Sequence, residues 1–366
     1  MHPYLVVLLF LGFEYNSVSY QISPEIFFLV VDGNVVLWNC ISHEQYIIDK
    51  QHFSEVLAVS KDGDANSIDI FNVLKSVGVI VKNDETPLWG WDILSRIFHI
   101  GTKDVPCEEI INDPDVFSHH YVEQCQQIEN AVPNFFQEKN TLIIDLPQPD
   151  ISLQNNTLSS ALLNRKTSRS FNGEPTTIQT LSNLLFASFG LIHGEWNEIE
   201  HAGLKIAGIR KASPSSGGLH AEEAYLTVFN VIGLESGLYY YRPQDHKLNL
   251  LMLGDFENKV INFNHNQFYS KGLSFGIYLT ARLDKYWWKY PHSRSYRTML
   301  LDIGHSSQTF LLCATALGLN TWLTAAFKDS EVESFLNING YEESVMMYVG
   351  GGYGKPLAFD KGFLPR

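Results

Sequence analysis

The chain has 366 residues, of which 45% are hydrophobic and 18% are charged, so it can bury a large core and is not a disordered protein. Its 40 acidic and 26 basic residues give a net charge of −14, which argues against a nucleic-acid partner held through phosphate neutralisation. An anionic cofactor is compatible with this charge, because it needs only a few well-placed cations.

The cysteines and the amino terminus exclude several classes of protein. Cys40, Cys107, Cys125 and Cys313 are far apart and form no CxxC pair, which argues against a zinc site and a disulfide framework and fits reduced thiols in a cytoplasmic protein. The apolar residues 4–11 are too few to span a bilayer and lack the basic flank and cleavage site of a signal peptide. We therefore expect a buried strand there, and no membrane association.

Residues 1–85 are predicted to form a small winged-helix-like α/β module. A hairpin is indicated by two apolar runs separated by Asp32-Gly33-Asn34. After this hairpin, apolar residues recur at helical spacing, and Ser67 is positioned to act as the N-cap of the second helix. The expected elements are strands at 26–31 and 35–38, helices at 52–59 and 67–77, and a strand at 79–81. Because no basic face is visible, we expect contact with a peptide or protein rather than with DNA.

Residues 86–150 read as an aromatic, proline-punctuated connecting region, with a helix over 89–99 that could pack between domains. Pro147 and Pro149 mark its end, so the third region is 151–366.

The third region has an α/β pattern. Thr176-Thr177 can cap a helix over 178–188, and the longest helix is expected over 302–317, closed by Gly318. The expected strands are 224–231, 238–241, 274–279 and 345–349, the last of them ending in Gly350–Gly352.

The stretch Pro214-Ser215-Ser216-Gly217-Gly218 predicts a stiff turn that ligands can approach closely. Proline fixes one dihedral angle, and adjacent glycines leave no Cβ in the way of a flat ligand. The backbone N–H groups of this turn would be free to donate hydrogen bonds, which would suit a planar, acceptor-rich ring such as a flavin. An ordinary turn is the alternative interpretation.

Other segments carry cations or small residues. Arg165-Lys166-Thr167-Ser168-Arg169 could hold a phosphate through charge-assisted hydrogen bonds, or could be a solvated basic helix end. The small residues after Leu323 could let a ring lie on the backbone, or could simply pack in a core. The glycine-rich residues 350–354, followed by Lys355, could close a phosphate site, or could form a C-terminal loop.

Taken together these motifs resemble the nitroreductase-like flavoproteins. The segments that carry the resemblance are 165–171, 213–220, 233–239, 302–309 and 316–319. The Gly-Gly-Leu-His that follows Pro-Ser-Ser is similar to the SagB-type branch of thiazole/oxazole-forming peptide dehydrogenases, and closer still to the group called peptide-maturation dehydrogenases. The resemblance covers roughly residues 151–356. It implies an α+β, nitroreductase-like FMN-binding fold, with a central mixed sheet flanked by helices and the winged-helix-like module in front.

The resemblance also implies a homodimer with two FMN sites at the subunit interface. The FMN phosphate and ribityl chain would be bound by Arg165, Lys166, Thr167 and Arg169, with Gly351 and Lys355 adding to the phosphate site. The isoalloxazine would be backed by Thr324 and Ala325 and reached from the partner subunit by Pro214, Ser215, Ser216 and Gly217.

The same branch carries a Lys-Tyr pair before an Arg-x-Tyr-Arg segment, which matches Lys289-Tyr290 before residues 294–297 with one extra residue between them. Aromatic neighbours would desolvate Lys289 and favour the neutral amine, which can act as a base, while Tyr290 could donate or relay a proton. Lys285 or Tyr296 could take over this role, and a surface lysine is the alternative interpretation of Lys289. His305 is expected to make a structural hydrogen bond in a buried helix.

The resemblance implies an FMN-dependent dehydrogenase that acts in the maturation of a ribosomally made peptide. The expected reaction is azoline-to-azole oxidation, with hydride transfer to flavin N5 and reoxidation by O2. Its partners would be a peptide substrate and a cyclodehydratase. The alternatives are an NAD(P)H-dependent nitro- or quinone reductase and a flavin-binding scaffold subunit. The sequence leaves open the substrate, and whether an azoline or another Cα–Cβ bond is oxidised.

Overall fold

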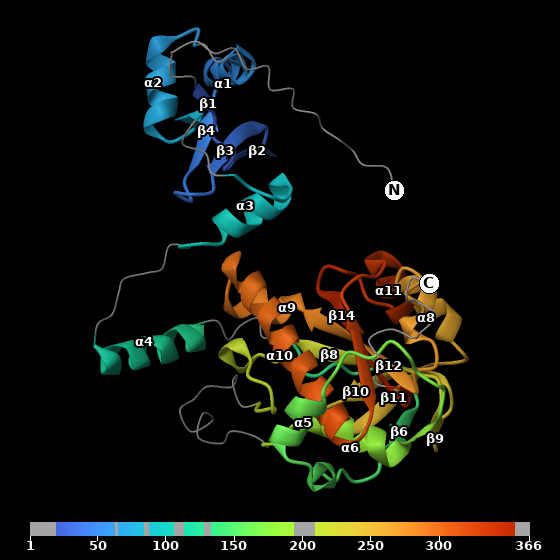
Figure 1. The fold of residues 1–366 in the computed structure, drawn as a ribbon. Coiled ribbons are helices and arrows are strands. Elements are labelled where there is room, and N and C mark those ends of the chain that lie inside the picture. Colours follow the sequence, from blue (N-terminus) through green and yellow to red (C-terminus); the bar gives the residue numbers. More distant parts are fainter. Residues whose placement is uncertain are drawn as a thin grey trace. The chain divides into compact units, whose positions relative to one another are not determined.

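The computed structural model describes residues 20–62, 65–83, 88–105, 113–127, 133–193 and 209–355. Contacts divide the chain into two compact units, Met1–Glu108 and Glu109–Arg366, whose elements are labelled in Figure 1. The predicted boundaries at 85 and 150 stay predictions. The apolar run at 4–11 and the side chains of Cys107 and Cys125 lie outside what the structure describes. Of the helices described, none is both long and apolar enough to cross a membrane.

In its described residues, the first unit combines two small antiparallel sheets with three helices. In one sheet β1 (Tyr20–Ile22) pairs with β5 (Ile80–Lys82), and the other has the order β2 (Ile26–Val31), β3 (Asn34–Asn39), β4 (Gln45–Ile48). The helices are α1 (Lys50–Asp62), α2 (Ile68–Ser76) and α3 (Ile93–Gly101). The predicted hairpin is confirmed, with positive φ at Asp32 and Gly33 in its turn. Ser67 caps α2 as predicted, because its hydroxyl accepts from Ile70 N–H.

Helix α3 begins four residues later than the sequence suggests, because Asp92 caps it by accepting from Ser95 N–H. Its buried Arg96 donates to the Glu25 carboxylate, which is also buried, with Nε 2.7 Å from Oε1. This pair attaches α3 to the sheets of the first unit.

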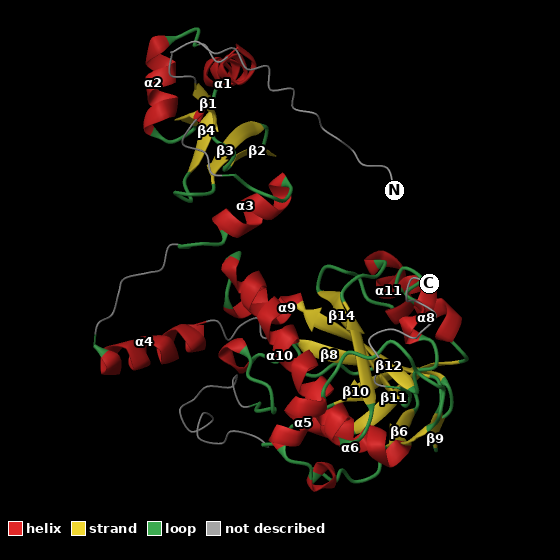
Figure 2. Ribbon diagram, in the orientation of Figure 1, coloured by secondary structure: helices red, strands yellow, loops and turns green. Residues whose placement is uncertain are grey.

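The second unit is built on a seven-stranded sheet (Figure 2). Its order is β13 (Asn320–Thr324), β14 (Glu343–Gly352), β12 (Phe275–Arg282), β8 (Glu222–Val228), β10 (Gly237–Arg242), β11 (Lys247–Leu253) and β6 (Ile143–Asp145). All neighbouring strands in this order run antiparallel. The mixed character expected of the sheet is therefore limited to a parallel bridge between Thr167 and Thr321 at its β13 edge. A separate parallel pair joins β7 (Thr176–Thr177) to β9 (Val231–Ile232).

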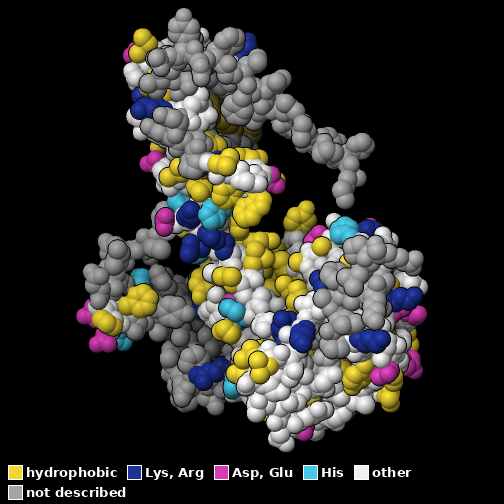
Figure 3. All heavy atoms as spheres, viewed as in Figure 1, with side chains coloured by type: hydrophobic (Ala, Val, Ile, Leu, Met, Phe, Trp, Pro, Cys, Tyr) yellow, Lys and Arg dark blue, Asp and Glu magenta, His cyan; other side chains and the backbone are white. Residues whose placement is uncertain are grey.

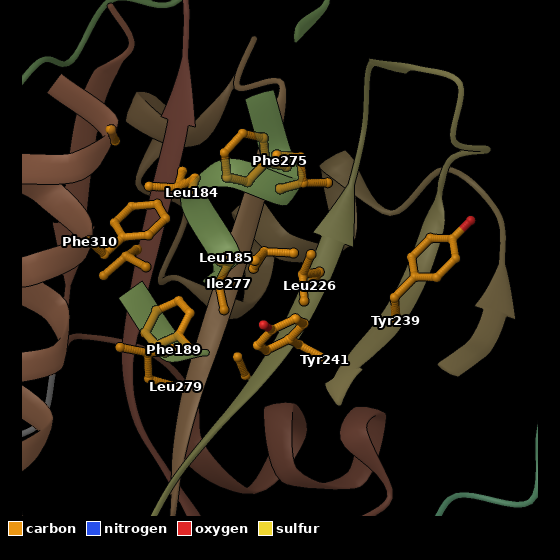
Figure 4. Packing of buried hydrophobic residues seen from close by; sticks show 14 of the residues in the cluster. Leu184, Leu185, Phe189, Leu226, Tyr239, Tyr241, Phe275, Ile277, Leu279 and Phe310 are labelled. Carbon is orange, nitrogen blue, oxygen red and sulfur yellow. The ribbon is translucent and has the colours of Figure 1, made fainter. Parts of the chain in front are cut away.

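Helices cover both faces of this sheet. They are α5 (Leu158–Asn164), α6 (Ile178–Phe189), α8 (Glu257–Phe263), α9 (Leu283–Lys289), α10 (Arg294–Ala316) and α11 (Asp329–Leu336), and α4 (Pro114–Gln127) precedes the sheet in the chain. Alternate residues of β8 and β12 enter two different cores. One core takes α6 and α10, with Leu185, Phe310 and Ile277 at its centre (Figure 4). The other core takes α8 and α11.

The glycines predicted to follow the last strand lie inside it, since β14 continues to Gly352. A Cβ at Gly350 would stand 2.6 Å from Leu273 Cδ1, and one at Gly351 would stand 2.9 Å from the ring of Phe275. Close packing therefore accounts for these glycines.

A substitution at Gly276 of β12 tests how tightly this sheet is packed. A Cβ there would overlap the ring of the buried Tyr348, so Gly276→Ala is expected to lower the free energy of unfolding by about 3 kcal/mol. Gly304→Ala is the control, because a Cβ at Gly304 has no neighbour within 4 Å among the described residues. As a helix substitution it is expected to raise stability by up to about 1 kcal/mol. Denaturant unfolding of both variants measures the difference, and equal stabilities would contradict this packing.

Candidate functional site

The Pro-Ser-Ser-Gly-Gly stretch forms a turn that leads into β8, and residues 214–218 are called the serine–glycine turn below. Its two glycines have φ values of 61° and 65°, a region that favours glycine over other residues. Gly218 N–H donates to Ser215 O over 3.0 Å, which closes the turn on itself.

A buried carboxylate lies behind this turn. Asp302 of α10 accepts from Ser215 Oγ at 2.7 Å, from Ser216 N–H at 2.9 Å and from the Tyr286 hydroxyl of α9. Burial raises the pKa of Tyr286, and the hydrogen bond to Asp302 raises it further, so this hydroxyl stays a donor at neutral pH. The sequence reasoning did not find Asp302 or Tyr286. An acidic residue on the apolar face of the long predicted helix was the available signal.

The expectation that the turn's N–H groups are free is wrong in two places. Ser216 N–H donates to Asp302, and Gly218 N–H donates to Ser215 O. Flavin contacts from Pro214, Ser215, Ser216 and Gly217 stay predictions.

Lys289 and Tyr290 lie directly against the turn. Lys289, the last residue of α9, is buried, and its Nζ donates to Gly217 O at 3.1 Å. A Cβ at Gly217 would overlap the Tyr290 hydroxyl and stand 2.9 Å from Lys289 Nζ. The structure therefore brings the predicted catalytic pair and the predicted ring-binding turn together.

The two alternative residues lie elsewhere. Lys285 is buried one helical turn before Lys289, where its Nζ donates to His220 O at 3.3 Å and faces Glu223 at 3.5 Å. Tyr296 is on the exposed side of α10. His305 is about half exposed, with Nδ1 3.9 Å from Asp302, so the expectation of a buried histidine was wrong.

Two adjacent glutamates at the start of β8, Glu222 and Glu223, have buried carboxylates. Glu222 pairs with Lys211 at 3.0 Å, whereas Glu223 faces Lys285. Burial alone would raise the pKa of Glu222, but the Lys211 ammonium and His220 outweigh it and hold this pKa well below its ordinary value. Burial lowers the pKa of Lys285. These pairs fix both ends of the segment that contains the serine–glycine turn.

The arginine segment, residues 165–169, lies along the edge strand β13. Ser168 holds it there, with N–H donating to Thr321 O at 2.8 Å and Oγ donating to Lys355 O at 2.9 Å. The Arg169 guanidinium lies 5.3 Å from the centre of the Tyr269 ring. Sequence reasoning missed the part played by Ser168, whose position between two cations was its only signal.

The remaining predicted cofactor residues also lie on or beside β13. Thr324 ends the strand and its hydroxyl accepts from Ala326 N–H, whereas Ala325 is exposed. Gly351 is buried in β14, opposite Thr321. Their contacts with a cofactor stay predictions.

Within one chain the arginine segment and the serine–glycine turn lie at opposite ends of the sheet, and Thr324 lies between them at the register of Tyr225. Thr321 of β13 lies beside the arginine segment and pairs with Gly351 of β14. Gly351 pairs in turn with Phe275 of β12, and Phe275 pairs with Val228 at the far end of β8. The serine–glycine turn precedes Glu222, at the near end of β8. Glu222 and Val228 are six residues apart along β8, and at a rise of about 3.3 Å per residue these ends of the strand are roughly 20 Å apart.

The order of elements and motifs can be compared with known proteins. The model of the nitroreductase family matches residues 162–353, which is more than half of the chain. The chain belongs to the nitroreductase family. The predicted nitroreductase-like fold is thereby confirmed, and the matched residues contain the arginine segment, the serine–glycine turn and the Lys289-Tyr290 pair of this family member.

Individual relatives of this nitroreductase-family chain are distant. A Methanocaldococcus jannaschii protein named as a nitroreductase is 27% identical over 202 residues, 55% of this chain and 93% of that protein. Trifolitoxin-processing protein TfxB of Rhizobium leguminosarum bv. trifolii is 33% identical over 142 residues, only 38% of each chain. A crystal structure from Anabaena variabilis, also named as a nitroreductase, has a TM-score of 0.49 and 24% identity, covering 69% of this chain and 49% of the other. That score is too low to support an inference about function.

The buried pair Glu222–Lys211 predicts a pH dependence of stability. The folded-state pKa of Glu222 is depressed, so its contribution is present above its unfolded pKa and is lost as the pH falls. Glu222→Gln is expected to lower the free energy of unfolding by about 3 kcal/mol at neutral pH. This loss should shrink as the pH falls below about 4, where the wild-type pair also weakens.

Denaturant unfolding at several pH values measures the effect. Glu331→Gln is the control, because Glu331 pairs with Lys328 at the surface and its loss should cost less than about 1 kcal/mol at any pH. A cost of Glu222→Gln that does not vary with pH would contradict the prediction.

Proposed function

We propose that this chain is an FMN-dependent dehydrogenase that acts in the maturation of a ribosomally made peptide, with azoline-to-azole oxidation as its reaction. The observation that carries the proposal is the packing of Lys289 and Tyr290 against Gly217. The buried amine of Lys289 and the phenol of Tyr290 lie beside Gly217, where they could remove a proton from a ligand bound on the serine–glycine turn. The similarity to a protein named for processing trifolitoxin supports a peptide as the substrate.

The residues present fit FMN. Arg165, Lys166, Arg169 and Lys355 give one end of the sheet a group of cations suited to a phosphate, and Ser168 joins their two segments. The small residues Thr324 and Ala325 lie further along the same edge strand, where a flat ring could rest. When bound, FMN supplies the hydride acceptor of the reaction.

A second subunit would complete each FMN site. The arginine segment and the serine–glycine turn of one chain are roughly 20 Å apart along the strands, so one chain alone does not offer both to the same flavin. An apolar surface also supports a homodimer, since hydrophobic side chains gather over α5, α9 and α10 (Figure 3). The exposed residues there are Leu158, Leu162, Leu163, Trp287, Leu300 and Leu301.

The chain's own residues would handle the proton. Oxidation of an azoline removes the Cα hydrogen as a proton and the Cβ hydrogen as a hydride. Lys289 would accept the Cα proton at Nζ, which Gly217 O holds in place. Tyr290 would donate or relay a proton through its hydroxyl, which lies against Gly217. The first unit would hold the peptide or a partner cyclodehydratase.

Substitution of the Lys–Tyr pair tests the reaction. Lys289→Ala and Tyr290→Phe are each expected to lower kcat by about 100-fold, the usual contribution of general acid–base catalysis, while FMN content is unchanged. Oxidation of a short synthetic thiazoline peptide, followed as the loss of two hydrogen atoms by mass spectrometry, measures this. Lys247→Ala, which removes a surface lysine paired with Asp145, should be neutral.

Three results would contradict parts of this proposal. Purified protein without FMN would refute it at the first step. Rapid reduction of the flavin by NADPH, with turnover of nitro compounds and none of the azoline, would favour a nitro- or quinone reductase, which the M. jannaschii relative's name suggests. Full product formation by both variants would indicate a scaffold role.

The two-chain site predicts complementation between defective subunits. Arg169→Ala and Lys289→Ala homodimers should each be nearly inactive, because both of their sites are damaged. A dissociated and reassociated mixture should recover about a quarter of wild-type activity, because half of the dimers are mixed and each of those has one intact site. No recovery, with mixed dimers shown by mass spectrometry, would place both segments in the same site of one chain.

A further inference from the structure

Asp302 lies where α9, α10 and the serine–glycine turn meet. Three donors converge on one of its oxygens, Oδ2, and they come from Ser215, Ser216 and Tyr286. Oδ1 lies 3.5 Å from Ser216 Oγ. The side chain is buried, so these donors replace the water that a carboxylate otherwise needs.

The hydrogen bonds of Asp302 connect it to the Lys–Tyr pair. Tyr286 lies one helical turn before Tyr290, whose hydroxyl packs against Gly217. Ser215 and Ser216 precede Gly217 directly, and its carbonyl holds Lys289 Nζ. Asp302 therefore contacts both segments, α9 and the turn, whose relative position sets the Lys289 amine against the turn.

A carboxylate suits this place better than an amide. All three partners at Oδ2 donate, and a carboxylate offers acceptors only, whereas the nitrogen of an asparagine would face donors in one of its two orientations. Hydrogen bonds to a charged acceptor are also roughly twice as strong as neutral ones.

We propose that Asp302 is a positioning residue that, together with Tyr286, holds the serine–glycine turn and so places Gly217 O under Lys289. A second contact assists it, because Ser213 Oγ lies 2.7 Å from Thr309 Oγ1, about two helical turns further along α10. The effect on catalysis rests on the proposed function, whereas the holding of the turn does not.

Hydrogen exchange of the turn amides tests the holding of the turn directly. In full-length protein, peptides that cover residues 213–221 should exchange about tenfold faster in Asp302→Asn, as expected for the loss of one charge-assisted hydrogen bond. Tyr286→Phe should show a smaller increase and keeps the test valid if Asp302→Asn folds poorly. Tyr239→Phe is the matched control, because it removes another buried tyrosine hydroxyl, bonded to Glu235 O at 2.7 Å. Unchanged exchange in folded Asp302→Asn would overturn the proposal.

Kinetics test the consequence for the Lys–Tyr pair. With the thiazoline peptide, Asp302→Asn should lower kcat about tenfold and leave KM nearly unchanged, because it displaces a reacting group rather than a binding contact. An unchanged kcat with faster exchange would overturn the positioning role. If the wild type carries no FMN and oxidises no azoline, the proposed function fails, while the exchange result still decides whether Asp302 holds the turn.

Discussion

The burial of two adjacent carboxylates at the start of β8 is the constraint on which the site depends. Glu222 and Glu223 face opposite sides of a strand that is buried along its whole length, so each side must supply a cation. Lys211 comes from the segment before the serine–glycine turn, and Lys285 comes from α9. The cations that neutralise the strand therefore also attach the turn and the helix to the sheet. A loop rich in serine and glycine is thereby attached to the sheet through Lys211.

The sheet then decides how the site can be assembled. Its strands are long enough to keep the arginine segment and the serine–glycine turn apart, and α10 contacts the turn through Asp302. A ligand that needs both a phosphate site and a proton acceptor would therefore use surfaces of two molecules. The apolar residues exposed on α5 and α10 are close in sequence to these two regions, since Leu162 and Leu163 precede Arg165 and Leu300 and Leu301 precede Asp302.

Local sequence predicts the parts of this fold that local physics controls. The Asp32-Gly33 hairpin and the Ser67 and Thr177 caps follow from turn and cap chemistry and are confirmed. The first two turns of α10 were missed because residues 294–301 lack a clean apolar stripe, and the start of β8 was missed because its glutamates read as exposed. In the site, the motifs located the turn and Lys289-Tyr290, but their contact joins residues about seventy positions apart. Asp302 lies in a motif that the sequence shows, but its role was missed for the same reason, since its partners on α9 and in the turn are distant in the chain.

The lysines near the two ends of the sheet differ in their exposure to solvent. Lys166 and Lys355, at the β13 edge, are open to solvent, where water stabilises a charged ammonium, so that end suits a permanent anion. At the other end Lys211, Lys285 and Lys289 are withdrawn from water, and burial lowers the pKa of Lys285. An acidic protein with few cations thus places some of them in water at one edge of the sheet and buries others beside the serine–glycine turn.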